Sequence, residues 1–203
     1  VKFVEYFYPE LIPNLSSAKS PAQMLGALAK TYYAKAINKN PEDIFSVSVM
    51  PCTAKKFEAT RPELQSANHF NKKDSIRDVD AVLTVRELAT MMKAANVDPG
   101  KLKEERYDSV MGEGSGAGLL FGKSGGVMEA AVRGAYYLVT KKVAPKEAFE
   151  LQAVRGLAGM KEASVEVPGV GALKVAVISG TKNARALLDR VKKGEASYHF
   201  IEV

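Results

Sequence analysis

The stretch Met50-Pro51-Cys52-Thr53-Ala54-Lys55-Lys56-Phe57-Glu58 decides the fold, together with the apolar segment 44–50 that leads into it. Segment 44–50 is rich in β-branched and apolar residues, which is typical of a strand buried on one or both faces. Cys52 therefore lies just past the carboxyl end of a predicted strand, where open α/β sheets build their sites. A thiolate beside two ammonium groups suits a soft metal ion or an anionic ligand.

Cys52 is the only cysteine of the chain, and its residue type alone leaves several roles open. A lone cysteine in an intracellular protein is most often a small, buried hydrophobic residue. A nucleophilic cysteine needs an activating group such as an imidazole, and only His69 and His199 are available, neither of them in a recognisable motif. An iron–sulfur cluster ordinarily needs four thiolates, so Cys52 cannot hold one alone.

Composition and charge indicate a piece of a soluble enzyme. The 203 residues, 46% of them hydrophobic, are enough for the core of one large or two small α/β units. We find no apolar run of the roughly 20 residues that span a membrane, no signal-peptide pattern, and too few cysteines for a disulfide framework. A reducing cytoplasm fits best, although a missing amino terminus could carry a targeting signal. The net charge of +6 is spread over short, interleaved clusters, which favours an ordinary solvated surface over a nucleic-acid site.

The pattern alternates helices and strands without repeats. Ser20-Pro21-Ala22-Gln23 predicts a helix start, with Ser as cap, Pro in the first turn and Gln placed for a capping box. Met24, Leu28 and Tyr32 would lie along one face of this helix, which should end near residues 40–41.

A second helix start follows a polar segment at 61–78 and a short predicted strand at 81–83. Thr84-Val85-Arg86-Glu87 predicts a capping box that opens a helix toward residue 97. Met91 and Met92 on this helix are expected in the core rather than as ligands.

The glycine-rich stretch from residue 112 matches two nucleotide-binding patterns incompletely. Gly112-Glu113-Gly114-Ser115-Gly116-Ala117 lacks the preceding strand that a dinucleotide fingerprint requires, and Gly122-Lys123-Ser124 lacks the first glycine of a phosphate loop. What remains is a backbone that a ligand can approach closely. It leads into a helix predicted at 127–140, whose free N–H groups favour an anion. The alternative is a purely structural turn.

The last third of the chain predicts a supporting hairpin and helix. Ser164-Val165-Glu166-Val167, the turn Pro168-Gly169-Val170-Gly171 and residues 173–178 form the expected hairpin. A helix at 184–193 and a strand at 198–203 follow.

Met50-Pro51-Cys52-Thr53-Ala54-Lys55-Lys56-Phe57-Glu58 resembles the second signature, M-P-C-x-x-K-x-x-E, of the iron-only or [FeFe] hydrogenases. Other stretches resemble the family in the same order along nearly the whole chain. These stretches are residues 14–21, 112–118 and 121–131, Val154-Arg155-Gly156, and 198–203.

The ends of the chain predict an internal fragment of such a protein. In the family, the signature T-S-C-C-P-x-W would come immediately before Val1, and M-A-C-x-x-G-C would follow Val203. The alternative is a deliberately trimmed piece. On this interpretation the 203 residues alone should be inactive.

The resemblance implies that Cys52 is one of four thiolates on a [4Fe–4S] cluster. A cysteine outside the chain would bridge this cluster to a di-iron unit that carries carbon monoxide, cyanide and a dithiolate, and the two together form the H-cluster. Lys55 would donate a charge-assisted hydrogen bond to a cyanide. The alternative of a plain surface lysine suits Lys56 better than Lys55.

The resemblance also implies further site residues. Ser16 resembles the serine of the family's proton path, although its spacing equally suits a loop cap. Met50 would pack beside the di-iron ligands and Pro51 would fix the turn. The other residues implied at the cofactor pocket are Pro21, Phe121 and Gly122, the last two in the far wall of a dry pocket.

The implied architecture is α/β, with two lobes of mostly parallel sheets, at about 1–110 and 111–203, that grip the cofactor. The implied activity is the reversible reduction of protons to dihydrogen. Ferredoxin or a similar acidic electron carrier and hydrogenase maturation proteins are the implied partners, and neither nucleic acid nor a membrane span is expected.

Two departures from the family pattern and two alternative functions stand beside this interpretation. Ala22 occupies a position where the family often has Gln, with Gln23 following, and residues 65–75 predict a surface insertion. One alternative is an iron–sulfur assembly or nuclear homologue without hydrogen chemistry, against which Lys55 argues. The other is a cofactor-free α/β binding module with a buried Cys52.

Overall fold

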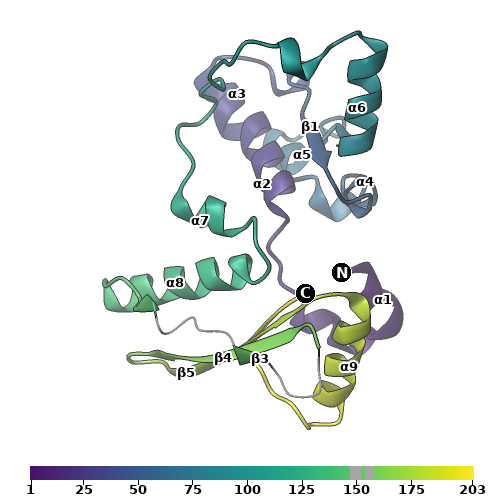
Figure 1. Ribbon diagram of the computed structural model, residues 1–203. Helices are drawn as coiled ribbons and strands as arrows, with labels where there is room; N and C mark the ends of the chain where they lie inside the picture. The colour runs from purple at the N-terminus through teal and green to yellow at the C-terminus, as the bar shows by residue number, and fades with distance from the viewer. Residues whose placement is uncertain (147–151, 154–157) are drawn as a thin grey trace. The chain divides into compact units, whose positions relative to one another are not determined.

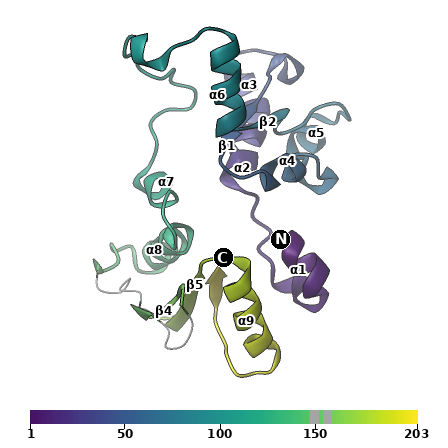
Figure 2. The same cartoon turned by 45° about the vertical axis from the view of Figure 1, so that its right-hand side comes forward.

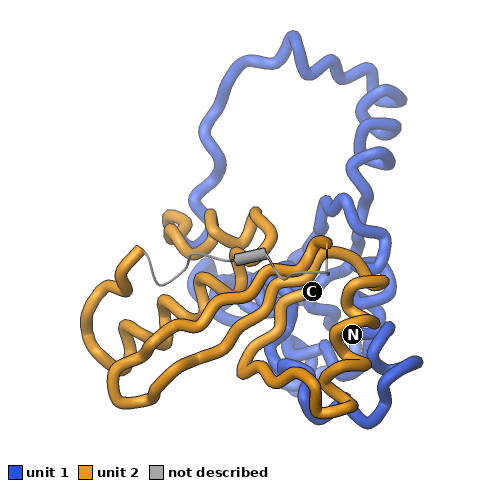
Figure 3. The backbone as a smooth tube through the Cα atoms, turned by 60° about the horizontal axis from the view of Figure 1, so that its bottom comes forward, with its two compact units in different colours: residues 1–112 blue, residues 113–203 orange. Residues whose placement is uncertain are grey.

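The structure is a computed structural model that describes residues 1–146, 152–153 and 158–203. The chain divides into two compact units, Val1–Gly112 and Glu113–Val203 (Figure 3). Each unit carries one small sheet accompanied by helices, which confirms the α/β class. The family-like stretch Val154-Arg155-Gly156 lies outside the described residues. In the part of the chain that the structure describes, no helix is both long and apolar enough to cross a membrane.

Unit 1 contains a two-stranded parallel sheet, in which Val47 lies opposite Ala81 and Met50 opposite Thr84. The two strands are joined by helical segments, as parallel neighbours require. The α-helices and strands of this unit, most of them labelled in Figure 1, are α1 (Lys2–Phe7), α2 (Pro21–Leu28), α3 (Ala34–Ala36), β1 (Val47–Met50), α4 (Ala54–Glu58), α5 (Ser66–Asn71), β2 (Ala81–Thr84) and α6 (Val85–Ala94).

The helix predicted at residue 21 begins there, since the Ser20 hydroxyl accepts a hydrogen bond from the Gln23 N–H at 3.4 Å. The reciprocal half of the expected capping box is missing, because the Gln23 Oε1 atom has no hydrogen-bond partner among the described residues. Helix α2 continues through a π-helical turn (Ala29–Tyr33) into α3. It ends at Ala36 rather than near residue 40, because Asn38 adopts a left-handed conformation (φ 52°).

Strand β1 is shorter and less buried than its sequence predicts. It covers Val47–Met50 of the predicted 44–50, and Val47 and Val49 are both exposed. The half-buried face instead carries Ser48 and Met50, because alternate residues of a strand point to opposite faces.

Helix α6 has the predicted capping box. The Thr84 hydroxyl accepts from the Glu87 N–H at 3.1 Å, and the Glu87 carboxylate accepts from the Thr84 N–H at 2.7 Å. The predicted core position of Met91 is wrong, because its side chain is 54% exposed.

The predicted surface insertion at 65–75 is wrong for part of the segment. Helix α5 buries Ala67, and Ile76 just beyond the segment is also buried. The exposed runs of the segment are residues 69–70 and 72–75. Although segment 65–75 is polar in composition, part of it packs on the rest of unit 1.

Unit 2 contains a mixed sheet with the strand order β3-β4-β5-β6. Strands β3 and β4 pair antiparallel, as do β4 and β5, whereas β5 and β6 pair parallel. The expectation of mostly parallel sheets is therefore wrong for this unit, because the predicted hairpin forms and a tight turn joins antiparallel strands. The elements of unit 2 are α7 (Gly116–Leu120), α8 (Gly126–Thr140), β3 (Gln152–Ala153), β4 (Met160–Val167), β5 (Gly171–Ile178), α9 (Thr181–Lys192) and β6 (Phe200–Glu202).

The core of unit 2 covers both faces of this sheet, which Figure 2 shows between α8 and α9. On one face, Met128 and Val132 of α8 pack on a row of valines. On the other face, Leu187 of α9 packs on Met160 and Ile178. The valines of the first face are Val165, Val167, Val175 and Val177.

Candidate metal and cofactor site

Cys52 lies in the short connection between β1 and α4, and its side chain is exposed and free. The alternative of a buried cysteine is therefore wrong. Within residues 1–146, 152–153 and 158–203, no group of three or more His, Cys, Asp or Glu side chains is arranged to hold a metal ion. The described residues thus fit a single sulfur ligand to a group that takes its other ligands from elsewhere.

Lys55 sits on the first turn of α4 and forms an ion pair with Glu58, at 2.7 Å between Nζ and Oε2. Both side chains are partly buried. The lysine and the glutamate of the M-P-C-x-x-K-x-x-E pattern therefore neutralise each other in this structure. An anionic ligand near Cys52 would compete with Glu58 for the ammonium group.

Lys56 points to a different part of unit 1. Its Nζ donates to the Val82 carbonyl at 2.9 Å and pairs with the Glu87 carboxylate at 2.9 Å. The Thr84 backbone N–H and then Lys56 lower the pKa of Glu87 to about 2. Lys56 thus ties α4 to the end of β2, which agrees with a structural role.

Ser16 is exposed, and its hydroxyl accepts a hydrogen bond from the Ala18 N–H at 3.1 Å. This is the loop cap that its spacing allows, and the hydroxyl keeps its own proton for donation. Further along the loop, Lys19 donates to Asp78 at 2.5 Å and to the Leu64 carbonyl at 2.8 Å. The loop that carries Ser16 and ends at Pro21 is therefore anchored to the interior of unit 1.

Asp78 anchors this loop, and sequence reasoning missed it. The side chain is 0% exposed and accepts from the N–H groups of Ser66 at 3.0 Å and Ala67 at 2.7 Å, besides Lys19. It therefore caps α5 from outside the helix. Asp78 has no motif around it, and its partners lie far away in the sequence, so no local pattern could identify it.

Gln23 follows the position at which the family often has a glutamine, and its side chain is buried. Gln23, Gly26 and Lys30 are all buried and share one face of the helix at spacings of three and four residues. This face packs on Asp78, because a Cβ atom on Gly26 would lie 2.2 Å from the Asp78 carbonyl oxygen. Ala22 is half-buried and lies four residues before Gly26, at the edge of this face, and the predicted loss of a polar group there remains a prediction.

The glycine-rich segment of unit 2 carries Phe121 and Gly122, both exposed, between α7 and α8. The predicted free N–H groups at the start of α8 are not free. The Glu202 carboxylate accepts from the Gly125 N–H at 2.8 Å and from the Met128 N–H at 2.7 Å. The expectation that this helix end attracts an anionic ligand is therefore wrong, because an internal carboxylate already satisfies it.

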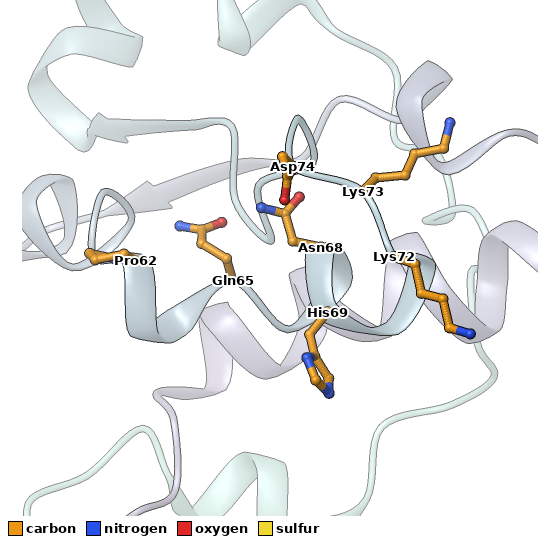
Figure 4. Close-up of a pocket in the computed structure, with 7 residues that line it drawn as sticks. All are labelled: Pro62, Gln65, Asn68, His69, Lys72, Lys73 and Asp74. Atoms are coloured by element: carbon orange, nitrogen blue, oxygen red, sulfur yellow. The ribbon is translucent and has the colours of Figure 1, made fainter.

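A separate hollow of about 540 Å³ lies in unit 1 and contains none of the predicted site residues (Figure 4). Two of its polar side chains serve the fold: Asn68 accepts from the Ile76 N–H, and Lys73 pairs with Glu42. Its lining consists of Pro62, Gln65, Asn68, His69, Lys72, Lys73 and Asp74.

The structure places the predicted site residues in both units. Unit 1 holds Ser16, Pro21, Met50, Pro51, Cys52 and Lys55, and unit 2 holds Phe121 and Gly122. The segment from Met50 to Lys55 places a thiol and an ammonium group three residues apart, after the end of one strand.

Comparisons with known proteins agree over the whole chain. Residues 1–203 match the family model described as iron only hydrogenase large subunit, C-terminal domain. A periplasmic [Fe] hydrogenase large subunit of Nitratidesulfovibrio vulgaris is 49% identical to this chain. The alignment covers 99% of this chain and 45% of that relative. Iron hydrogenase 1 of Clostridium pasteurianum is 48% identical to this chain, and the alignment covers 100% of this chain and 34% of that relative. This chain thus spans less than half of either relative.

The fold is similar to solved structures of the same kind. An apo [FeFe]-hydrogenase from Chlamydomonas reinhardtii has a TM-score of 0.80 and a sequence identity of 37% to this chain. The superposition covers 98% of this chain and 55% of the hydrogenase chain. More distant relatives include cytosolic Fe-S cluster assembly factors, for example one of Nematostella vectensis that is 31% identical over 95% of this chain.

Proposed function

Because this chain belongs to the family of iron-only hydrogenase large subunits, we propose that it forms part of a catalytic domain that interconverts protons and electrons with dihydrogen. The observation that carries the proposal is the exposed Cys52 thiol after the end of β1, three residues before Lys55 on the first turn of α4. The identity of 48–49% to two hydrogenases also supports it.

Cys52 would hold the cofactor as one of four thiolates on a [4Fe–4S] cluster, with the other three supplied by polypeptide outside these 203 residues. When bound, the cluster and its di-iron unit would supply the electrons and the metal centre at which protons are reduced. Met50 and Pro51 would shape the protein on either side of the ligating sulfur. Since the chain has one cysteine, it should show no turnover alone.

Lys55 would bind and orient a cyanide of the di-iron unit by a charge-assisted hydrogen bond, and its ion pair with Glu58 would weaken as it does so. An ammonium group has three donors, so Lys55 can also keep part of its contact with Glu58. Phe121 and Gly122 would exclude water from the cofactor, and Pro21 would contact it. Ser16 would relay protons: its hydroxyl oxygen would accept one proton as its own O–H proton moves toward the metal centre.

An acidic electron carrier such as ferredoxin would suit the net charge of +6. Maturation proteins would be needed to deliver the di-iron unit. We propose the cytoplasm on composition, although the relative of Nitratidesulfovibrio vulgaris is a periplasmic protein.

A non-hydrogenase role of the assembly-factor kind is the second candidate. Lys55 argues against it, because a cyanide ligand is the group for which this lysine is suited. The lower identity to the assembly factor, 31%, also disfavours it.

The test compares Lys55→Ala with Lys56→Ala in the full-length, matured protein, with Cys52→Ala as the third variant. We expect the wild type to show cyanide stretching bands and to evolve dihydrogen. Lys55→Ala should shift or lose these bands while most of the cluster iron stays. Lys56→Ala should leave the bands in place, because its partners are Val82 and Glu87.

Cys52→Ala should abolish activity and lower the iron content, because one iron loses a ligand. Full iron content with near-normal activity in Cys52→Ala would contradict the ligand role. A wild type with iron but without cyanide bands would point to the assembly-factor alternative.

A further inference from the structure

Glu202, near the carboxyl end of the sequence, caps the first turn of α8. The residue lies on β6, 77 positions after Gly125 and 74 after Met128, and each carboxylate oxygen accepts one of their backbone N–H groups. The first four N–H groups of a helix have no partner inside it. One side chain therefore satisfies donors on both sides of the helix start, and its negative charge lies at the positive end of the helix dipole.

The local sequence cannot provide this cap. The residue at the cap position is Gly125, which has no side chain and adopts a left-handed conformation (φ 80°). Gly126 is equally constrained, because a Cβ atom there would lie 1.7 Å from the Leu120 carbonyl oxygen. The two glycines let the chain turn tightly, and the capping oxygen must then come from elsewhere in the fold.

The same turn is held on its other side by Lys123. Its ammonium pairs with Glu129 on the first turn of α8 at 2.7 Å. Arg133 also pairs with Glu129, at 2.8 Å, and the hydrogen bond from Lys123 is the main reason that the pKa of Glu129 lies below its ordinary value. The turn 121–126, which carries Phe121 and Gly122, is thus fixed before any cofactor is present.

We propose that Glu202 is a positioning residue that fixes the turn 121–126 and so sets where Phe121 and Gly122 meet the cofactor. This inference rests on the proposed function of those two residues. Because Glu202 neutralises the helix end, α8 contributes no free positive end toward an anionic ligand. Loss of the carboxylate would loosen the turn and expose that end.

The test uses Glu202→Gln and Glu202→Ala in the full-length protein, before and after maturation. Gln has nearly the same shape and keeps one acceptor oxygen, whereas Ala removes both. Glu166→Gln, at an exposed glutamate on β4, is the matched control.

The first readout is hydrogen–deuterium exchange of peptides covering residues 121–130 in the protein without di-iron unit. We expect exchange at the start of α8 to be faster by roughly tenfold in Glu202→Gln, the usual effect of losing a cap, and by more in Glu202→Ala. The control should exchange like the wild type. Unchanged exchange in both Glu202 variants would overturn the proposal.

The second readout is the cyanide infrared bands of the matured protein, together with the retention of the di-iron unit. We expect broadened or shifted bands and lower retention in both Glu202 variants. Faster exchange with wild-type bands and retention would reduce Glu202 to a plain helix cap and overturn the positioning role. A wild type without cyanide bands would mean that the proposed function fails, and the positioning role fails with it.

Discussion

The two units bury different kinds of groups. In unit 1 the buried side chains include Asp78, at 0% exposure, and Lys30, at 2%, whereas several of its buried apolar residues are alanines. In unit 2 the buried side chains form two apolar clusters around Met128 and Leu187. Directional contacts can fix several loops at once, and apolar packing supports a regular sheet. The unit that carries Cys52 is therefore organised by charge, and the unit that carries the glycine-rich turn is organised by packing.

Asp78→Ala should have the largest effect. It leaves the Lys19 ammonium and the N–H groups of Ser66 and Ala67 without their shared acceptor, and breaking a buried pair of this kind costs about 3–5 kcal/mol. Denaturant unfolding measures the loss, and exchange of residues 64–68 shows whether it lies in unit 1. The control is Asp74→Ala at an exposed position. Equal stability of the two variants would contradict a charge-organised unit.

Leu187→Ala should have the next largest effect, in unit 2. The side chain is fully buried between α9 and the sheet, and truncation of a buried leucine costs about 2–5 kcal/mol. Leu138→Ala, at an exposed leucine of α8, removes the same atoms and should change the free energy of unfolding by less than about 0.5 kcal/mol. If both variants lose the same stability, packing does not organise this unit.

Lys30→Met should sharpen the comparison at a smaller scale. Lys30 pairs with Asp80 at 2.5 Å, and Asp80 also accepts from the Ser46 N–H at 2.6 Å, so the carboxylate keeps one partner. We expect a loss of about 2 kcal/mol by thermal unfolding, because Asp80 is partly hydrated. Adding Asp80→Asn should recover part of it. If Lys30→Met alone is as stable as the wild type, the charge of Lys30 is not needed for the stability of unit 1.

Tyr198→Phe tests a polar contact at the edge of the packed unit. The Tyr198 hydroxyl donates to Glu162 at 2.7 Å, and partial burial, followed by this bond, raises the pKa of Tyr198 to about 12. The loss should be about 1 kcal/mol. Because the folded pKa is raised, the stabilisation is complete below pH 10 and is lost as the pH rises toward 12. We therefore expect the difference in free energy of unfolding between the wild type and Tyr198→Phe to shrink as the pH rises from 10 to 12. A difference that does not change with pH would show that Tyr198 is not the cause.

Glu87 should give the smallest effect, in unit 1. Its pKa is lowered from 4.5 to about 2, mainly by the Thr84 backbone N–H, so its contribution is complete above pH 4.5 and is lost as the pH falls toward 2. The start of α6 should therefore fray in that window. Amide exchange at residues 84–88 measures the fraying, and Glu87→Gln should make it independent of pH. A wild type that frays only below pH 2 would refute the assignment.

Local patterns predicted the local structure of both units. The Ser20 cap, the Thr84 capping box and the hairpin that turns at Pro168 depend on residues a few positions apart, and all three form. A short sequence window contains all the groups that such contacts need. Cys52 was predicted as a site residue in the same way, because its motif is contiguous, and its role stays a prediction.

Long-range contacts account for what the sequence did not predict. Asp78 and Lys19 are 59 positions apart, and Glu202 and Gly125 are 77 apart, so neither pair leaves a pattern in one sequence. The burial of β1 was also misjudged, because burial depends on which elements cover a strand rather than on its own residues.

The π-helical turn Ala29–Tyr33 keeps the two halves of its helix in phase. Gly26 before the turn and Ala34 after it are both buried, although eight residues of an uninterrupted α-helix would rotate them apart by about 80°. A π turn holds one extra residue, which reduces that difference to about 20°. A one-residue deletion in the turn would therefore restore a regular α-helix and keep Ala34 on the inward face, whereas a regular α-helix at the present length would turn Ala34 away from the interior. The apparent irregularity is what allows one continuous helix to present a single inward face.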